Sequence, residues 1–319
     1  MQVSESNQKW IAIGVAIGTT SIAIVSLIAF SVNVLQEYGA VLFTLVPLAL
    51  GVLSTSIYGY FRPRSLKESA RISFYTLLLA CGILILFNIE GIVCVLMAAP
   101  FAAVFVFMGT WIGYKVQKRD KGQVIKFFSF NLLVIPILMV AESECFEREG
   151  CEIEVKTSIV INASKETVWD NVVKFPDIPA PTEWIFKTGI AYPTSSEIIG
   201  SGKGAVRYCE FTTGSFVEPI EIWDEPNLLQ FSVREQPIPL RRMIHEKTNV
   251  PGNMYKYFVS NKEQFRLTEL GKNEVLLEGT TWYYHKIKPV VYWKIWSEYI
   301  IHSIHNRVLT HIKAVSENA

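Results

Sequence analysis

The sequence lacks an excess of charge of either sign. Its 319 residues carry 30 basic and 29 acidic side chains, so the formal net charge is +1. A protein that binds nucleic acid through its phosphates needs an excess of Lys and Arg. We therefore expect no nucleic-acid partner.

The balanced average conceals an uneven distribution. All five histidines and most acidic residues lie after residue 140, whereas nearly all long apolar runs lie before it. We predict three parts: a transmembrane helical domain at residues 1–141, a linker at 142–151, and a water-exposed domain at 152–319.

Short motifs typical of common active sites are also missing. The chain has no Ser-His-Asp order, nucleophile elbow, phosphate-binding glycine loop or paired-carboxylate arrangement. His302 and His305 could share a helix face, but no acidic or thiolate residue stands at a familiar zinc spacing from them. We predict no metal and no cofactor, and the motifs assign no catalytic residue.

Five apolar runs in the first half approach the ~20 residues that a helix needs to cross a bilayer. The third run is short, and the fifth carries Asn131 and Pro136. Lys9 is the only basic residue before the first run, and no convincing small-residue cleavage site accompanies the run. Both observations favour a membrane anchor over a signal peptide. The runs are Trp10 to Phe30, Tyr38 to Tyr60, Ile72 to Phe87, Gly91 to Val116, and Val124 to Val140.

Lys and Arg are absent from two loops between these runs, 31–37 and 88–90, and concentrated in the other two. Basic loops stay on the cytoplasmic side of a membrane. The amino terminus is then cytoplasmic, and five spans place the second domain outside, in the periplasm if the membrane is a bacterial inner membrane. The basic residues are Arg62, Arg64, Lys67 and Arg71, then Lys115, Lys118, Arg119 and Lys121.

Two polar features near the membrane have competing interpretations. Cys145 and Cys151 flank a short charged loop on the outer side, where a disulfide can persist. We predict that they pair, and two free thiols in a flexible linker remain the alternative. Glu90 is either a costly carboxylate at membrane depth or part of an interfacial turn, and we expect the turn.

From residue 152 the hydrophobic period changes to two, which predicts a half-buried strand to Ile161. Ser164 is placed to cap a short helix, and a second short helix is expected around Trp184 to Lys187. About six further strands follow, separated by short turns, which implies an antiparallel sheet. These strands are expected up to Gly200, then at 204–213, 215–223, 228–234, 262–270 and 274–285.

The last segment, Pro289 to Val315, contains no glycine and no further proline, which predicts a long terminal helix. An apolar stripe on this helix should lie against the sheet. On a helical wheel the stripe consists of Trp293, Trp296, Ile300, Ile304, Val308 and Val315.

Three features of the second domain belong together: the strand followed by Asn162-Ala163-Ser164-Lys165-Glu166-Thr167-Val168-Trp169, the hairpin from Val217 to Val233 with Trp223-Asp224-Glu225-Pro226 at its turn, and the terminal helix. In this order they resemble the START-related superfamily of polyketide cyclases, lipid-transfer and Bet v 1-like proteins. The resemblance covers about residues 152 to 316. It implies a helix-grip fold, in which a bent antiparallel sheet surrounds the helix and encloses an apolar cavity.

The resemblance implies that a lipid-like or other hydrophobic small molecule binds in this cavity, drawn from the adjacent bilayer. Strand alternation does not tell whether Trp282 and Tyr284, or Tyr283 and His285, face it. The predicted ligand-binding residues are Trp282, Tyr284, Trp296, Ile300 and Ile304, with Arg307 and His311 at the polar end of the ligand.

Alternatives remain for this domain. Arg241, Arg242 and His245 lie in a basic connection that is either a lid over the cavity or a solvated loop. The superfamily also contains enzymes, so a cyclase or hydrolase with His311 or His285 as acid or base is the second hypothesis. A sensor or assembly module with a filled core is the third.

Overall fold

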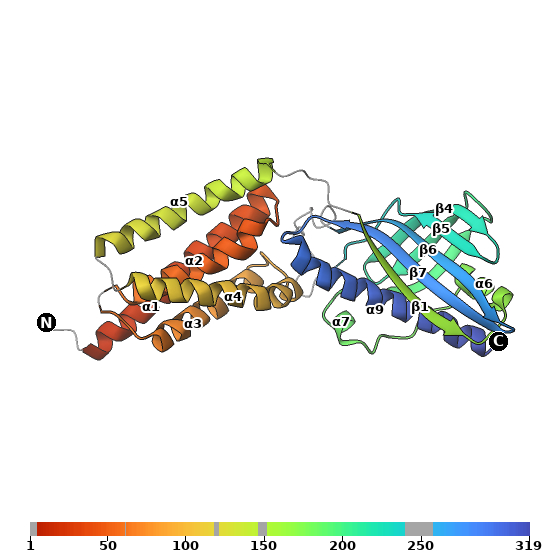
Figure 1. Ribbon diagram of the computed structural model, residues 1–319, viewed down its shortest axis with the longest axis horizontal. Helices are drawn as coiled ribbons and strands as arrows, with labels where there is room; N and C mark the ends of the chain where they lie inside the picture. The colour runs from red at the N-terminus through yellow and green to blue at the C-terminus, as the bar shows by residue number, and fades with distance from the viewer. Residues whose placement is uncertain (1–4, 61, 118–120, 146–151, 240–257) are drawn as a thin grey trace. The chain divides into compact units, whose positions relative to one another are not determined.

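The computed structural model describes residues 5–60, 62–117, 121–145, 152–239 and 258–319 (Figure 1). The chain forms two compact units, one of Met1–Glu147 with Ile287–Pro289 and one of Arg148–Lys286 with Val290–Ala319. Residues 142–145 of the predicted linker belong to helix α5 (Lys121–Cys145), and the predicted domain bounds stay predictions. Residues 146–151, with Cys151, lie outside the described residues, as do Arg241, Arg242 and His245.

The first unit is helical. Within its described residues, four helical segments are long and apolar enough to cross a membrane: Asn7–Leu35, Ala40–Tyr58, Leu66–Leu86 and Ile92–Val116. They correspond to the first four predicted runs and support a membrane protein. The helices are α1 (Glu5–Ala29), continued by a π-helical segment (Phe30–Leu35), then α2 (Ala40–Tyr58), α3 (Leu66–Leu86), α4 (Ile92–Val116) and α5 (Lys121–Cys145).

The fifth predicted run folds as helix α5. Several of its side chains lie outside the described set, and the four membrane-spanning candidates do not include it. Five spans and the side of the membrane that carries the second unit therefore stay predictions.

Close backbone contact and hydroxyl pairs hold this bundle together. A Cβ added at Gly109 of α4 would lie 2.0 Å from the carbonyl oxygen of Leu48 in α2, so only glycine fits there. The Ser73 hydroxyl lies 2.9 Å from that of Ser54 and 2.8 Å from that of Thr110. Small residues and interhelical hydrogen bonds are the usual means of helix association in lipid, where water provides no hydrophobic drive.

The carboxylates at helix ends in this unit have structural partners. Tyr38 donates a hydrogen bond to Glu90 at 2.9 Å. Glu142 accepts from the backbone N–H groups of Ala40 (2.7 Å) and Val41 (3.0 Å), at the start of α2. Amides in a first helical turn have no partner within the helix, so an acceptor there stabilises it.

The second unit contains one antiparallel sheet of seven strands in the order β1-β7-β6-β5-β4-β3-β2. Ser164 caps the first helix by accepting from the N–H of Thr167 at 3.2 Å, as predicted. The elements are β1 (Ile153–Ile161), α6 (Lys165–Val173), α7 (Trp184–Lys187), β2 (Pro193–Ile199), β3 (Val206–Phe211), β4 (Gly214–Asp224), β5 (Leu228–Ser232), β6 (Phe258–Gly271), β7 (Glu274–His285) and α9 (Val290–Glu317).

Helix α9 lies along one face of this curled sheet (Figure 1). A Cβ added at Gly279 of β7 would lie 3.7 Å from the side chain of Leu309, and the Tyr283 hydroxyl lies 2.6 Å from that of Ser297. Odd-numbered residues of β7 therefore face the helix, and we call this side of the sheet the inner face. The arrangement confirms the predicted α+β class with a helix-grip topology.

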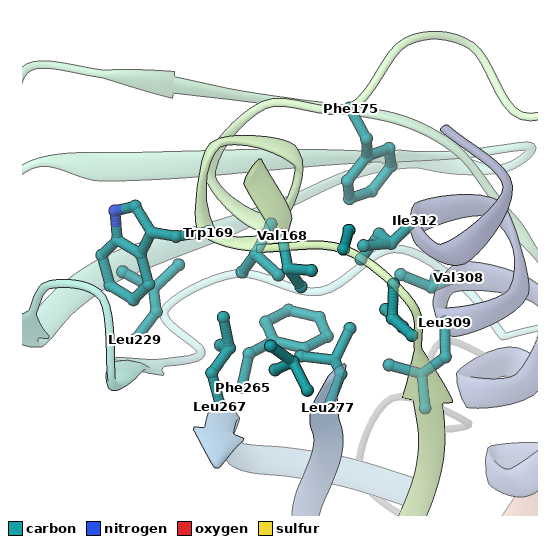
Figure 2. Packing of buried hydrophobic residues seen from close by; sticks show 14 of the residues in the cluster. Val168, Trp169, Phe175, Leu229, Phe265, Leu267, Leu277, Val308, Leu309 and Ile312 are labelled. Atoms are coloured by element: carbon teal, nitrogen blue, oxygen red, sulfur yellow. The ribbon is translucent and has the colours of Figure 1, made fainter. Parts of the chain in front are cut away.

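The main apolar core joins α6, the sheet and α9. Figure 2 shows Val168 of α6, Leu277 of β7, and Leu309 and Ile312 of α9 pointing toward one another, with Trp169 of α6 beside Leu229 of β5. These side chains are at most 2 % exposed. Burial of this kind contributes about 25 cal/mol per Å² of apolar surface, and it fixes α9 on the inner face.

The rotation of α9 about its axis differs from the predicted stripe. Trp293 and Val308 are buried as expected, but Trp296, Ile300, Ile304 and Val315 are only partly buried. The wheel counted only apolar residues, whereas polar Ser297 and His305 also face the sheet because they find hydrogen-bond partners there. The buried side consists of Trp293, Ser297, Ile301, His305, Arg307, Val308, Leu309, Ile312 and Ser316.

Candidate functional site

Polar side chains cross the inner face in a row that links five strands and α9. Strand registers place them on one side: Arg207 is opposite Glu218, and Glu263 is opposite Thr281. Arg207, Glu218 and Thr281 are at most 3 % exposed, which is unusual for charged groups. We call this set the interior polar row: Arg207 of β3, Glu218 of β4, Glu263 of β6, Thr281 of β7, His305 of α9 and Thr157 of β1.

Arg207 is the charged centre of the row. Its guanidinium forms an ion pair with Glu218 and lies 4.7 Å from the ring centroid of Phe231 and 5.8 Å from that of Phe265. Within the described part of the chain, its Nε–H has no hydrogen-bond partner. The hydroxyl of Ser196 on β2, a strand next to β3, also lacks a partner among those residues. Buried donors without acceptors are costly and mark a place where another molecule can bind.

The second carboxyl of the row, Glu263, favours its neutral form. Burial raises its pKa to about 8, the charge of Glu218 adds to the shift, and Arg207 and a hydrogen bond from Thr281 oppose it. Burial also raises the pKa of Glu218, against the effect of its ion pair with Arg207. Near neutral pH Glu263 therefore holds a proton, while the ion pair with Arg207 favours the charged form of Glu218 against the effect of burial.

Histidine and threonine side chains continue the row onto α9. The Thr281 hydroxyl lies 2.8 Å from Nε2 of His305, and the Thr157 hydroxyl lies 2.9 Å from Nδ1 of the same ring. Thr157 also lies 2.8 Å from Nδ1 of His302. Burial lowers the pKa of His305 to about 4, helped by the charge of His302, so the His305 ring is neutral near pH 7.

The structure separates the predicted ligand-binding residues into two groups. Trp282 and Tyr284 have even numbers on β7 and so lie on the face away from α9. The Trp282 indole donates to Glu154 at 3.0 Å, and Lys262 Nζ lies 4.2 Å from its ring. A role for these two in an interior site stays a prediction that their position does not favour.

The other predicted residues lie on α9. Arg307 donates to the carbonyls of Pro193 (3.0 Å) and Pro179 (2.5 Å), and the ring of His311 lies 3.0 Å from the carbonyl of Pro176. These contacts attach the segment between α6 and β2 to the helix. Trp296, Ile300 and Ile304 are half-buried on α9, and His285 is buried on β7.

Arg207, Glu218 and Glu263 were not identified from the sequence. Strand alternation could have indicated Glu263, because it stands two and four residues before Phe265 and Leu267 on β6, which are buried, and so lies on the same side of the strand. In the described residues, no group of three or more His, Cys, Asp or Glu side chains could hold a metal ion. The carboxyl, hydroxyl and imidazole groups of the row can form hydrogen bonds and exchange protons.

No family model matches the chain, and no curated protein matches it. Solved structures with a similar arrangement include the aromatase/cyclase Zhui from Streptomyces sp. R1128, at 14 % identity and a TM-score of 0.36, which covers 53 % of this chain and 95 % of that one. Norcoclaurine synthase from Thalictrum flavum has 14 % identity, a TM-score of 0.34 and coverages of 53 % and 95 %. Protein XoxI from Bacillus cereus has 17 % identity, a TM-score of 0.33 and coverages of 51 % and 94 %. At such low identities and TM-scores these likenesses carry no argument about activity.

Proposed function

We propose that the second unit binds a hydrophobic small molecule with a hydrogen-bond-accepting oxygen, between the inner face of the sheet and α9. The observation that carries this proposal is the buried Arg207 Nε–H, which has no partner among the described residues, in an interior otherwise lined with aromatic side chains. A ligand oxygen would accept from this group, and the Ser196 hydroxyl on the neighbouring strand offers a second contact.

Energetics support a ligand at this position. A buried donor without an acceptor costs about 1–3 kcal/mol, and a ligand oxygen would recover that cost. Phe231 and Phe265 flank the guanidinium and offer apolar surface to the body of the ligand. Burial of that body at roughly 25 cal/mol per Å² would supply most of the affinity, and the polar contacts would set its orientation.

A dansylated fatty acid tests this proposal on the full chain in lipid nanodiscs. We expect saturable fluorescence above that of empty nanodiscs. Arg207→Lys keeps the charge beside Glu218 but removes the Nε–H donor, so affinity should fall by about tenfold, which corresponds to ~1.4 kcal/mol.

Arg234→Lys is the matched control, because Arg234 is exposed just after β5 and should bind the probe like the wild type. Absence of saturable binding by the wild type would contradict the proposal and favour a filled core. An equal loss in the Arg234 variant would show that the effect is unspecific.

We further propose that the second unit lies outside the cytoplasm, next to the bilayer that supplies its ligand. The four apolar helices and the distribution of basic loops support this topology. The proposal requires α5 to be a fifth span.

Fusions to alkaline phosphatase, which is active only outside the cytoplasm, test the topology in a bacterial host. A fusion after residue 117 should be inactive, and a fusion after residue 319 should be active. An inactive fusion at both positions would mean that α5 does not cross the membrane and that the second unit faces the cytoplasm.

A further inference from the structure

The interior polar row contains an unbroken chain of hydrogen-bonding groups that ends at the protein surface. Glu263 is directly opposite Thr281 on the neighbouring strand, and a side-chain hydrogen bond from Thr281 lowers the pKa of Glu263. Thr281 contacts Nε2 of His305, and Nδ1 of His305 contacts Thr157. Thr157 contacts Nδ1 of His302, the half-buried member of the chain. Every interior member of the chain therefore has one neighbour on each side.

When Glu263 is ionised, the number of protons on each group determines which partner donates in every hydrogen bond of the chain. The carboxylate can only accept, so the Thr281 hydroxyl donates to it and in turn accepts from His305 Nε2–H. A neutral imidazole carries one proton, so His305 Nδ1 accepts from Thr157. The Thr157 oxygen then accepts from His302 Nδ1–H.

Protonation of Glu263 reverses each of these bonds. Glu263 now donates to Thr281, Thr281 donates to His305 Nε2, His305 Nδ1–H donates to Thr157, and Thr157 donates to His302 Nδ1. The two arrangements differ by one proton in total: a proton enters at Nε2 of His302, each proton along the chain moves to the next group, and the last one binds to Glu263. No group has to leave its position to move between them.

We propose that this chain is a proton relay between solvent at His302 and Glu263, and that it makes Glu263 the acid–base residue of a proton-transfer site. This inference rests on the proposed function, because the proton is exchanged with the bound hydrophobic hydroxy or carbonyl compound. In the acid direction the Glu263 O–H bond breaks and an O–H bond to the ligand oxygen forms. The relay then returns a proton from water to the carboxylate.

The surroundings of Glu263 suit this role. Three charged or titratable groups interact electrostatically with Glu263: Glu218 of β4, and Arg207 and Cys209 of β3. Thr281 of β7 is its hydrogen-bond partner. Because burial and Glu218 favour the neutral carboxyl while Arg207 favours the charged one, its pKa of about 8 lies near the range where an acid–base group works best. His305 stays neutral, as a relay member must, since its pKa is about 4.

Time-resolved infrared spectroscopy after photorelease of a caged proton tests the relay on the full chain in nanodiscs. The C=O stretch of the protonated carboxyl reports on Glu263 and is assigned by its loss in Glu263→Gln. Thr157→Val removes the hydroxyl between His305 and His302 while the volume of the side chain stays nearly unchanged. It should slow the protonation of Glu263 by about tenfold or more, while the pH midpoint of the band stays unchanged because Thr157 does not contact Glu263.

Thr157→Ser keeps a hydroxyl and should retain the wild-type rate, as should Thr310→Val at an exposed position of α9. If Thr157→Val does not fold, Thr281→Val is measured for the protonation rate alone, since Thr281 contacts Glu263 and its loss also raises the pH midpoint. An unchanged rate in the valine variant, or an equal slowing in Thr157→Ser, would overturn the relay. Dansyl fatty acid binding is measured separately: a lost relay with intact binding contradicts only this inference, whereas a working relay without binding contradicts only the proposed function.

Discussion

Replacing Arg207 with Met is expected to lower the free energy of unfolding of the second unit by about 3–5 kcal/mol, because it leaves Glu218 buried without its cation. Arg207 and Glu218 are 2 % and 1 % exposed, so water cannot replace the lost partner. Denaturant unfolding of the full chain in nanodiscs, followed by tryptophan fluorescence, measures the change.

The double variant Arg207→Met with Glu218→Leu should recover most of the lost stability, since removal of both members leaves no uncompensated charge in that pair. Lys294→Met serves as a control, because Lys294 pairs with Glu298 at 3.5 Å on the exposed side of α9 and such pairs contribute about 0.5 kcal/mol or less. A double variant as unstable as the single one would show that Arg207 acts mainly through its aromatic contacts.

Replacing Glu263 with Gln is expected to stabilise the second unit at alkaline pH. The pKa of Glu263 is about 8 in the folded state, whereas an unfolded Glu titrates near ~4.3, so the folded state binds more protons between these values. Stability of the wild type therefore falls as pH rises through this window. Gln does not ionise, and the variant should exceed the wild type by about 2 kcal/mol at pH 8 after allowance for partial solvent exposure.

Glu269→Gln is the matched control on the same strand, because Glu269 is exposed. His305 contributes with the opposite sign: its lowered pKa of about 4 means that stability is lost as pH falls from ~6.5 toward 4, and this loss should persist in both variants. Parallel pH profiles for the wild type and Glu263→Gln would contradict a neutral Glu263 in the folded protein.

Most of the fold could be predicted from the chain because it depends on local patterns. Three local patterns each determine one element: the period-two alternation from residue 152, the Ser164 cap, and the uninterrupted segment after Pro289. Within the described residues, four of the apolar runs form helices long and apolar enough to cross a membrane. The predicted rotation of α9 about its axis was wrong, because polar Ser297 and His305 also face the sheet. Their hydrogen-bond partners, Tyr283, Thr157 and Thr281, come from strands that are distant in the sequence.

The candidate site was harder to predict for the same reason. A charged residue in a strand is normally assigned to the solvent side, and only pairing across strands shows that Arg207, Glu218 and Glu263 share an interior. His305 was considered only as a metal ligand, although its hydrogen bonds to Thr157 and Thr281 give it a different environment. The disulfide of Cys145 with Cys151 and the lid residues Arg241, Arg242 and His245 remain predictions.

Native mass spectrometry of the full chain, extracted from its membrane and followed by organic extraction, tests the central claim most directly. We expect a bound hydrophobic molecule with a carbonyl, carboxyl or hydroxyl oxygen, retained by the wild type and by Arg234→Lys and depleted in Arg207→Lys. A wild-type protein that is empty, and stays empty after incubation with total membrane lipid, would contradict it.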